Sequence, residues 1–337
     1  AKAAQGAPLF VLARAPGQRG PPLAAKRLTA SFPQDVVLKS TDAMISGTGF
    51  AVGQELEVTA RISNGGSAMP TAGDPVGVAR VKVGAGGVVG TAAIAKATPD
   101  GYTIGSGNLA PLAVNPTLMT MLPYNPQKDL MPVILIENSP LVLSVSNSLP
   151  VKNLADLIAL AKKEPGKLTF GSSGIGGAHH LSGEMFRDLA KIDIVHVPYK
   201  GGAPASTDLM AGHISMMFEM GYAALPAIEG KKIRPLAVTS TKRLALLPDV
   251  PTMAELGVAD FESYNWQGII APTGTPAAII SRLNTALNEI LRDPEVIKQI
   301  ADTASQAGGG TPEDFARFIA SETTKWAKVI KSANIQP

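Results

Sequence analysis

From Val76 onward, short apolar runs alternate with segments of helical period, and this alternation most restricts the folds open to the chain. VGVARVKV (76–83), HISMMFE (213–219) and IRPLAVTS (233–240) are typical of the runs. Each has the length of a strand that is buried on both faces. Between such runs, segments like 154–166 and 178–190 place apolar residues at helical spacing. Strand and helix in alternation predict an α/β protein with a parallel sheet and crossover helices.

Two helices are predicted near the end of the chain. Residues 276–293 carry apolar side chains on one face, and Thr311-Pro312-Glu313-Asp314 has the composition of a helix start. The Thr is a capping residue, the Pro fits the first turn, and the acids lie at the positive end of the helix dipole. We expect the following residues of these helices in the core: Ile279, Ile280, Leu283, Leu287, Ile290 and Leu291, then Phe315, Phe318, Ile319, Trp326, Val329 and Ile330.

The first eighty residues carry a weaker pattern. LFVLA (9–13) and QDVVLKS (34–40) favour strands, and PPLAAKRLTASF (21–32) favours a helix. Residues 41–75 are rich in Gly and Ser and contain only short β-like runs.

Composition excludes several classes of protein. The chain has 337 residues, of which 45% are hydrophobic and 17% charged, so it has apolar residues enough for about two folded domains. No cysteine is present, which excludes disulfides, thiolate metal sites and a cysteine nucleophile. A net charge of only +3 without a long Lys/Arg run argues against a nucleic-acid binder. No apolar run reaches the ~20 residues that span a bilayer.

The segment FGSSGIGGAHHLSGEMF (170–186) is rich in glycine but lacks the known catalytic and phosphate motifs. A GxGxxG pattern fails because position 179 is His, and a GxSxG elbow fails because Ile175 stands in place of its last Gly. His179 and His180 are adjacent and point roughly 100° apart on a helix, so with His196 and His213 they predict no metal site.

A nucleotide site is the alternative that stays open. VKVGAGGVVGTAAIA (81–95) reads as strand, glycine turn and helix, with Gly84, Gly86 and Gly90 in the turn. No acidic residue ends a strand about twenty residues later, as ribose recognition requires. A nucleotide-dependent α/β enzyme that uses the Gly84–Gly90 turn is therefore the second hypothesis.

Binding of an anion by backbone N–H groups fits the glycine loops best. Glycines at 174, 176 and 177 precede a predicted helix, whose positive end attracts negative charge. Similar loops occur at 197–210 and at 106–108, and all three are expected at the carboxyl ends of parallel strands. We expect Val at Gly174 or Gly176 to weaken binding far more than it lowers stability.

Several motifs follow one another with the spacing of a known family. GAGGVVGTAAIAKATPDGYTI, FGSSGIGGAHHLSGEMF, DIVHVPYKGGAPASTDLMAG, LPDVPTMAELG and WQGIIAPTGTP lie between about Val81 and Ile335. In this order the chain resembles the periplasmic solute-binding proteins of tripartite tricarboxylate transporters, the Bug family of receptors.

The resemblance implies a periplasmic binding protein type II-like fold, an α/β Venus flytrap of two lobes joined by two crossovers. Residues 1–138 and 237–337 would form lobe one, 139–236 would form lobe two, and the crossovers would lie near Pro140 and Leu236. The implied function is an extracytoplasmic receptor that binds a small organic carboxylate (di-, tri- or aromatic) in the interlobe cleft. The receptor would deliver this ligand to membrane permease subunits and have no catalytic activity.

The same resemblance implies no cofactor, no metal, no nucleic-acid partner and a monomeric state. The resemblance also implies a periplasmic protein, and because no signal peptide is visible we expect the chain to be its mature form. The expected ligand-binding residues are Ser106, Gly107, Asn108, Ser172, Ser173, Gly174, Gly176, Gly177, Ala178, His180, Pro198, Tyr199, Lys200, Gly201 and Glu219.

The chain departs from the family pattern at three places. Gly177 stands where the family's S-x-G-x-G-T-x-x-H loop has Thr, and Glu219-Met220 stands where Asp-Asn is common. The family's first loop, a PFxxGG-type turn with an Asp, has only LFVLARAPGQRG (9–20) as its counterpart, which would place contacts at Ala15–Gly20. Residues 40–80 have no family counterpart and are either an insertion or an unreliable stretch of sequence.

Overall fold

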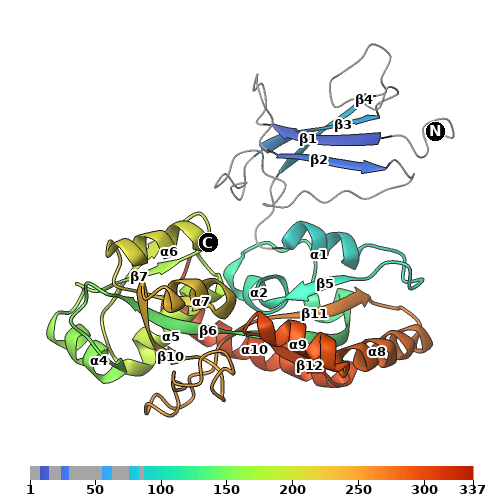
Figure 1. Cartoon of the computed structure of the whole chain (residues 1–337). Helices are drawn as coiled ribbons and strands as arrows, with labels where there is room; N and C mark the ends of the chain where they lie inside the picture. Colours follow the sequence, from blue (N-terminus) through green and yellow to red (C-terminus); the bar gives the residue numbers. More distant parts are fainter. Residues whose placement is uncertain (1–7, 15–23, 30–54, 63–75, 83–86, 337) are drawn as a thin grey trace. The chain divides into compact units, whose positions relative to one another are not determined.

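The computed structural model describes residues 8–14, 24–29, 55–62, 76–82 and 87–336 (Figure 1). The chain divides into two compact units, Ala1–Ala85 and Gly86–Pro337. The first unit contains a four-stranded antiparallel sheet in the order β2-β1-β3-β4. Its strands are β1 (Pro8–Arg14), β2 (Ala24–Thr29), β3 (Glu55–Ile62) and β4 (Val76–Lys82).

Strands predicted at 9–13 and 76–83 are confirmed, but the helix predicted at 21–32 is wrong. Residues 24–29 form β2, which pairs with β1 from Thr29 to Ala24. Local helix propensity is a weak preference that strand pairing overrides. The strand predicted at 34–40 and the proposed loop at Ala15–Gly20 lie outside the described residues.

The second unit is built on a mixed sheet in the order β5-β11-β6-β9-β7-β8, and β10 and β12 also pair with β6. The strands are β5 (Gly105–Asn108), β6 (Leu130–Ser146), β7 (Thr169–Ser172), β8 (Val195–Pro198), β9 (Met216–Met220), β10 (Ile233–Val238), β11 (Tyr264–Pro272) and β12 (Gln306–Gly309).

One long strand, β6, joins the two halves of this sheet. Residues 130–140 pair with β11, and residues 141–145 pair with β9. The sequence predicts two strands, 132–140 and 141–147, whereas the structure has one that changes partner after Pro140. The chain returns through residues 239–263, because Leu236 lies inside β10, which still pairs with β6. The positions of the crossovers and the lobe boundaries stay a prediction.

Helices cover both halves of the sheet (Figure 1). In chain order they are α1 (Val88–Ala95), the π-helical turn Ala110–Val114, α2 (Asn115–Leu118), α3 (Pro126–Asp129), α4 (Leu154–Lys163), α5 (Ala178–Ala190), α6 (Gly202–Ala211), α7 (Gly221–Glu229), α8 (Ala277–Leu291), α9 (Pro294–Asp302) and α10 (Pro312–Ser332). In Figure 1, α4–α7 surround the half with β7–β9, and α8 and α9 lie at the half with β5 and β11.

The long helix α10 begins as its sequence predicts. Thr311 Oγ1 accepts a hydrogen bond from Asp314 N (3.1 Å), and Asp314 Oδ2 accepts one from Thr311 N (2.9 Å), which is a capping box. The predicted core residues Phe315, Ile319, Trp326 and Ile330 are buried. In α8, Ile280 and Leu291 are buried but Ile290 is 53% exposed, so the buried face is narrower than predicted.

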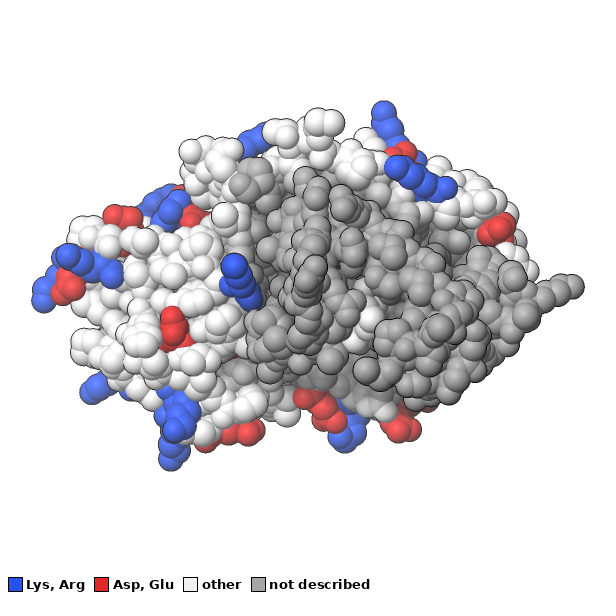
Figure 2. Space-filling view, turned by 90° about the horizontal axis from the view of Figure 1, so that it is seen from above, with Lys and Arg blue, Asp and Glu red and all other residues white. Residues whose placement is uncertain are grey.

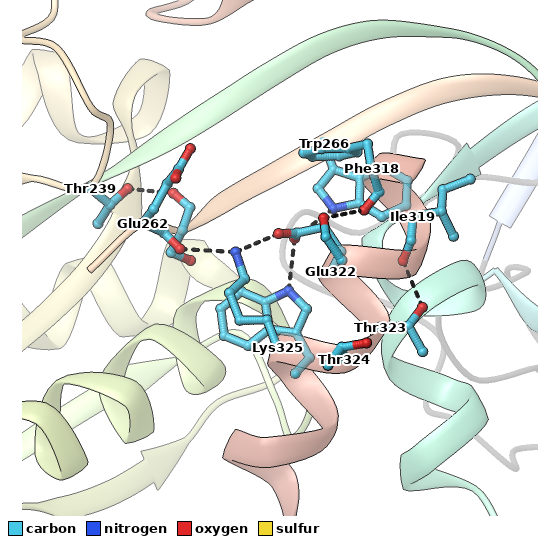
Figure 3. Close-up of polar contacts among 12 residues, drawn as sticks. Thr239, Glu262, Trp266, Phe318, Ile319, Glu322, Thr323, Thr324 and Lys325 are labelled. Carbon is cyan, nitrogen blue, oxygen red and sulfur yellow. Dashed lines mark hydrogen bonds and ion pairs between the residues drawn. The ribbon is translucent and has the colours of Figure 1, made fainter. Parts of the chain in front are cut away.

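A buried carboxylate, Glu322, connects α10 to the sheet (Figure 3). Its Oε2 accepts hydrogen bonds from the indole N–H groups of Trp266 and Trp326, both at 2.9 Å. Its Oε1 pairs with Lys325, whose Nζ also donates to the Glu262 carbonyl at 3.0 Å. Trp266 belongs to β11 and Glu262 to the returning crossover, so this cluster ties α10 to the segment that joins the two halves of the sheet. Nothing in the sequence marks Glu322 as different from an exposed helical Glu.

We expect Glu322→Gln to lower the free energy of unfolding of the second unit by roughly 2–3 kcal/mol. The amide keeps one acceptor oxygen but loses the charge, and its NH₂ group competes with the indole donors. Both tryptophans of the chain lie in the second unit, so denaturant unfolding followed by tryptophan fluorescence reports on that unit. Glu289→Gln, at an exposed position of α8, is the control and should change stability little. Equal stability of the two variants would contradict this role of Glu322.

Candidate functional site

Three helices begin where three parallel strands end. Strand β7 pairs in parallel with both β8 and β9, so the carboxyl ends of all three strands lie at one edge. Helices α5, α6 and α7 follow these strands along the chain. The connection from β7 leads to β8, whereas the connection from β9 leads through α7 to β10 on the other side. The connections that follow β7 and β9 therefore lead to opposite sides of this pair of strands. Open α/β sheets bind ligands at such a point.

The N-termini of these helices carry no side-chain cap. The capping positions are Gly177 for α5, Gly201 for α6 and Met220 for α7, and none accepts a hydrogen bond through its side chain. The first N–H groups of a helix have no partner within the helix, and they form the positive end of its dipole. Three such ends at one sheet edge suit a negatively charged group.

The loop between β7 and α5, residues 172–177, is held by three histidines. Ser172 Oγ lies 2.6 Å from His196 Nε2, and Ser173 Oγ lies 2.7 Å from His179 Nδ1. Gly176 N–H donates to His180 Nδ1 at 3.1 Å. Ser172 is fully buried, and His180 is 4% exposed. The hydroxyl of Ser172 and Nδ1 of His180, both predicted to be ligand groups, therefore bind the loop itself.

Glycine is required at two positions of this loop for its backbone. Gly176 has a φ of +74°, and an added Cβ would lie 2.5 Å from Leu118 Cδ2 of α2. Gly174 has a φ of +133°. Valine at either position would strain the chain, so such variants are expected to lose stability as well, and the larger effect on binding stays a prediction.

The second predicted loop is joined to the first by backbone hydrogen bonds. Tyr199 N–H donates to Ser172 O (3.0 Å), and Gly201 N–H donates to Ser173 O (3.2 Å). The Tyr199 hydroxyl donates to Asp208 Oδ2 of α6 at 2.7 Å, and desolvation together with this neighbour raises the pKa of Tyr199 to about 12. Pro198 and Lys200 are exposed. The structure thus brings together the predicted residues of the 172–178 and 198–201 segments.

The third predicted loop, Ser106 to Asn108, is not a loop. These residues belong to β5, which pairs antiparallel with β11. A Cβ on Gly107 would meet Leu112 and Ile270, so glycine here permits close packing. Two residues from the half that contains β5 and β11 approach the 172–177 loop instead. They are Leu118 and Val114, and both lie within 4 Å of a Cβ placed on Gly176.

Glu219 lies on β9 beside this edge, and its side chain is almost fully buried. The residue is 2% exposed, and its Oε1 accepts a hydrogen bond from Ser206 of α6. Among the described residues, its Oε2 has no hydrogen-bond partner. Burial raises the pKa of this carboxyl above its usual range, which favours the neutral form. The family resemblance predicts Glu219 as a ligand-binding residue, and this stays a prediction. The contacts of His179 and His196 were missed, because no local pattern links a histidine to a loop from another strand.

Other surface features lie away from this edge. One hollow of about 680 Å³ lies at α5 and α10, and another of about 910 Å³ lies at α8 and α10. None of the predicted ligand residues lines either hollow. On the face drawn in Figure 2, the coloured Lys and Arg side chains form no continuous basic patch. The described residues contain no group of three His, Asp or Glu side chains placed to hold a metal ion. Within the same ranges, no helix has both the length and the apolar character needed to cross a bilayer.

Comparison with known sequences finds two matching families. Residues 63–335 match the family described as "Tripartite tricarboxylate transporter family receptor". Residues 1–91 match the "Cytochrome c-type biogenesis protein H Ig-like domain". The receptor-family match begins at residue 63, so the expectation that all of residues 40–80 lack a family counterpart is wrong for 63–80. Residues 40–80 also lie within the segment that is similar to the Ig-like domain. The chain is also 39% identical over 260 residues to Protein BugT of Bordetella pertussis, which covers 77% of this chain and 79% of that protein.

Solved structures agree with the first of these matches. The structure titled "R. palustris Rpa4515 with adipate" is 38% identical, with a TM-score of 0.68, over 76% of this chain and 86% of that one. The periplasmic binding protein BugD is 32% identical, with a TM-score of 0.64, over 76% and 86%. MatC (Rpa3494) from Rhodopseudomonas palustris with bound malate is 29% identical, with a TM-score of 0.63, over 74% and 86%. The fold is therefore that of type II-like periplasmic binding proteins.

The buried histidines predict a loss of stability in mild acid. Burial lowers the pKa of His179 to about 4, and burial followed by the charge of His180 lowers that of His196 to about 4. As the pH falls below the unfolded value of about 6.5, the unfolded chain binds protons that the folded chain does not, so the free energy of unfolding decreases.

We expect this loss between about pH 7.5 and about pH 5 to be smaller in His179→Gln than in the wild type, by roughly 1–2 kcal/mol. Comparing variants removes the opposing contribution of Glu219, whose raised pKa favours the folded state in acid. His213→Gln, at an exposed histidine, should keep the full pH dependence. Tryptophan fluorescence in urea gives the measurement, and identical pH profiles for His179→Gln and the wild type would contradict the assignment.

Proposed function

Because the chain belongs to the tripartite tricarboxylate transporter receptor family, we propose that it binds a small organic carboxylate at the carboxyl ends of β7, β8 and β9. The observation that carries this proposal is the convergence of three uncapped helix N-termini, α5, α6 and α7, at one sheet edge. The protein would act in the periplasm and deliver its ligand to membrane permease subunits. It would have no catalytic activity, as its relatives are solute-binding receptors.

Recognition would come from backbone N–H groups and helix dipoles rather than from an arginine clamp. A hydrogen bond to a charged group contributes about 1.5–3 kcal/mol. Three or four such bonds, offset by the cost of ordering the ligand and the protein, are consistent with binding near −8 kcal/mol, which is roughly micromolar. Lys200, exposed beside Gly201, would add long-range attraction for an anion.

Ligands of the solved relatives support dicarboxylates as the first candidates. Adipate and malate, named in the titles of two similar structures, each carry two carboxylates. In this chain one carboxylate would lie at the three helix N-termini. The other would extend toward the half of the sheet that contains β5 and β11, where the π-helical turn and α2 approach the 172–177 loop.

The nucleotide-dependent enzyme is disfavoured by strand pairing. A dinucleotide fingerprint requires a parallel βαβ unit around its glycine turn. Here β4, the strand before that turn, pairs antiparallel with β3, and the strand after α1 pairs antiparallel with β11. Gly84 and Gly86 themselves lie outside the described residues.

A ligand screen separates these functions. We expect di- or tricarboxylates such as adipate or malate to raise the melting temperature followed by tryptophan fluorescence, because a ligand that binds only the folded state stabilises it. NAD, NADP and a neutral diamide of adipate serve as controls and should leave the melting temperature unchanged. Stabilisation by NAD or NADP alone would favour the enzyme.

Gly202→Asp tests the location of the site. Gly202 is the first residue of α6, and a Cβ there would meet nothing within 4 Å. An Asp at this position is favourable for the helix dipole but places a negative charge where the ligand carboxylate would bind. We expect carboxylate affinity to fall roughly tenfold or more, about 1.4 kcal/mol, with no loss of thermal stability.

Gly202→Asn is the matched control, since it has nearly the same shape without the charge. Calorimetric titration with the carboxylate found in the screen should give Asn close to the wild type and Asp much weaker. If both variants bind like the wild type, α6 is not part of the site.

A further inference from the structure

Three of the four histidines of the chain contact the same loop. His179 and His180 lie in the first turn of α5, and His196 lies in β8, yet each of the three has one ring nitrogen in contact with residues 172–177. The fourth histidine, His213, is exposed and pairs with Asp208 instead. Three rings from two elements therefore determine the position of one loop.

Two of these rings stack on each other, that of the buried His180 and that of the half-buried His196. The centroids of His180 and His196 lie 3.8 Å apart with an angle of 15° between the ring planes, and Phe170 stacks on His196 at 5.0 Å. Each ring then reaches a different end of the loop, because His196 contacts Ser172 while His180 contacts Gly176. The stack keeps the two contacts at a fixed separation.

The contact of His180 with Gly176 requires one tautomer. A backbone N–H can only donate, so Nδ1 of His180 must carry no proton. The proton of the neutral ring is then on Nε2, which faces Glu184 Oε1 at 3.5 Å, and Arg187 pairs with the other oxygen of Glu184 at 2.7 Å. Glu184 thus favours the tautomer that leaves Nδ1 free to accept.

Among the described residues, His180 Nδ1 is the acceptor of the Gly176 N–H. The φ of Gly176, +74°, is in the left-handed region, and this glycine lies two residues before α5 begins. A loop with glycines at 174, 176 and 177 loses much conformational entropy when it is ordered. An acceptor for the Gly176 N–H offsets part of that cost and holds the following N–H groups of α5 toward the sheet edge.

We propose that His180 and His196 are positioning residues, which order the 172–177 loop so that the N-terminus of α5 is ready to bind a carboxylate. The ligand does not contact Nδ1 of His180 in this arrangement. The affinity part of the inference rests on the proposed carboxylate-binding function. The ordering of the loop does not, and it is tested separately.

A pair of substitutions at His180 separates the hydrogen bond from the packing. His180→Phe keeps a ring for the stack but removes the acceptor, whereas His180→Asn removes the ring but offers its Oδ1 near the position of Nδ1. We expect His180→Phe to weaken carboxylate binding about tenfold in calorimetric titration with adipate or malate, and His180→Asn to recover most of that loss. His213→Phe is the control and should bind like the wild type.

Amide hydrogen exchange of the full-length protein tests the ordering of the loop without ligand. We expect exchange within residues 172–178 to be at least several-fold faster in His180→Phe than in the wild type. In His180→Asn it should be slower than in His180→Phe and return toward the wild-type rate. If His180→Phe does not fold, His196→Phe and His196→Gln form the same comparison at Ser172, because the Gln amide reaches the position of Nε2.

The outcomes distinguish the two proposals. If the wild type binds no carboxylate, the proposed function is contradicted. If the loop then exchanges faster in the Phe variants only, the positioning role is still supported. Exchange and affinity in the Phe variants equal to the wild type would overturn the positioning role. Equal losses in the Phe and the Asn or Gln variants would also overturn it, since an acceptor returned to the position of the ring nitrogen would then recover nothing.

Discussion

Parallel pairing of β7 with both β8 and β9 is the interaction on which the candidate site depends. It brings three strand ends to one edge, and each strand is followed by a helix whose first N–H groups lack a side-chain cap. Separately, each of these helix starts would be solvated by water. Together their dipoles and N–H groups concentrate positive potential at one place, which is the physical basis of the proposed binding of an anion through backbone groups.

Polar groups near this edge form hydrogen bonds with one another. The loop between β7 and α5 uses serine hydroxyls and a backbone N–H to pair with three histidines, so its own polar groups are bound before any ligand arrives. Neutral imidazoles suit this position because a ring can accept through one nitrogen and donate through the other. Glu219, with one buried oxygen that has no partner among the described residues, is the exception beside the site.

The two halves of the second unit are joined by few elements. Strand β6 runs through both, residues 239–263 return, and α10 packs across with Glu322 at its centre. Two indoles and an ammonium group surround this carboxylate, which makes its burial tolerable and fixes α10 relative to β11. The 1–85 unit has an antiparallel sheet of its own and lies within the segment, residues 1–91, that is similar to a different domain.

The sequence by itself determined the α/β class, most helices and strands after Val76, the start of α10 at Thr311 and the two glycine loops at 172–178 and 198–201. These follow from patterns within one segment: apolar period, capping residues and glycines before a helix. Tertiary structure decided that residues 24–29 are a strand, that Ser106 to Asn108 lie in β5, and that Ser172 and His180 face inward. It also brought His196 to Ser172 and Glu322 to Trp266. Such contacts join residues far apart in the chain, and their energies depend on pairing and burial that no local pattern encodes.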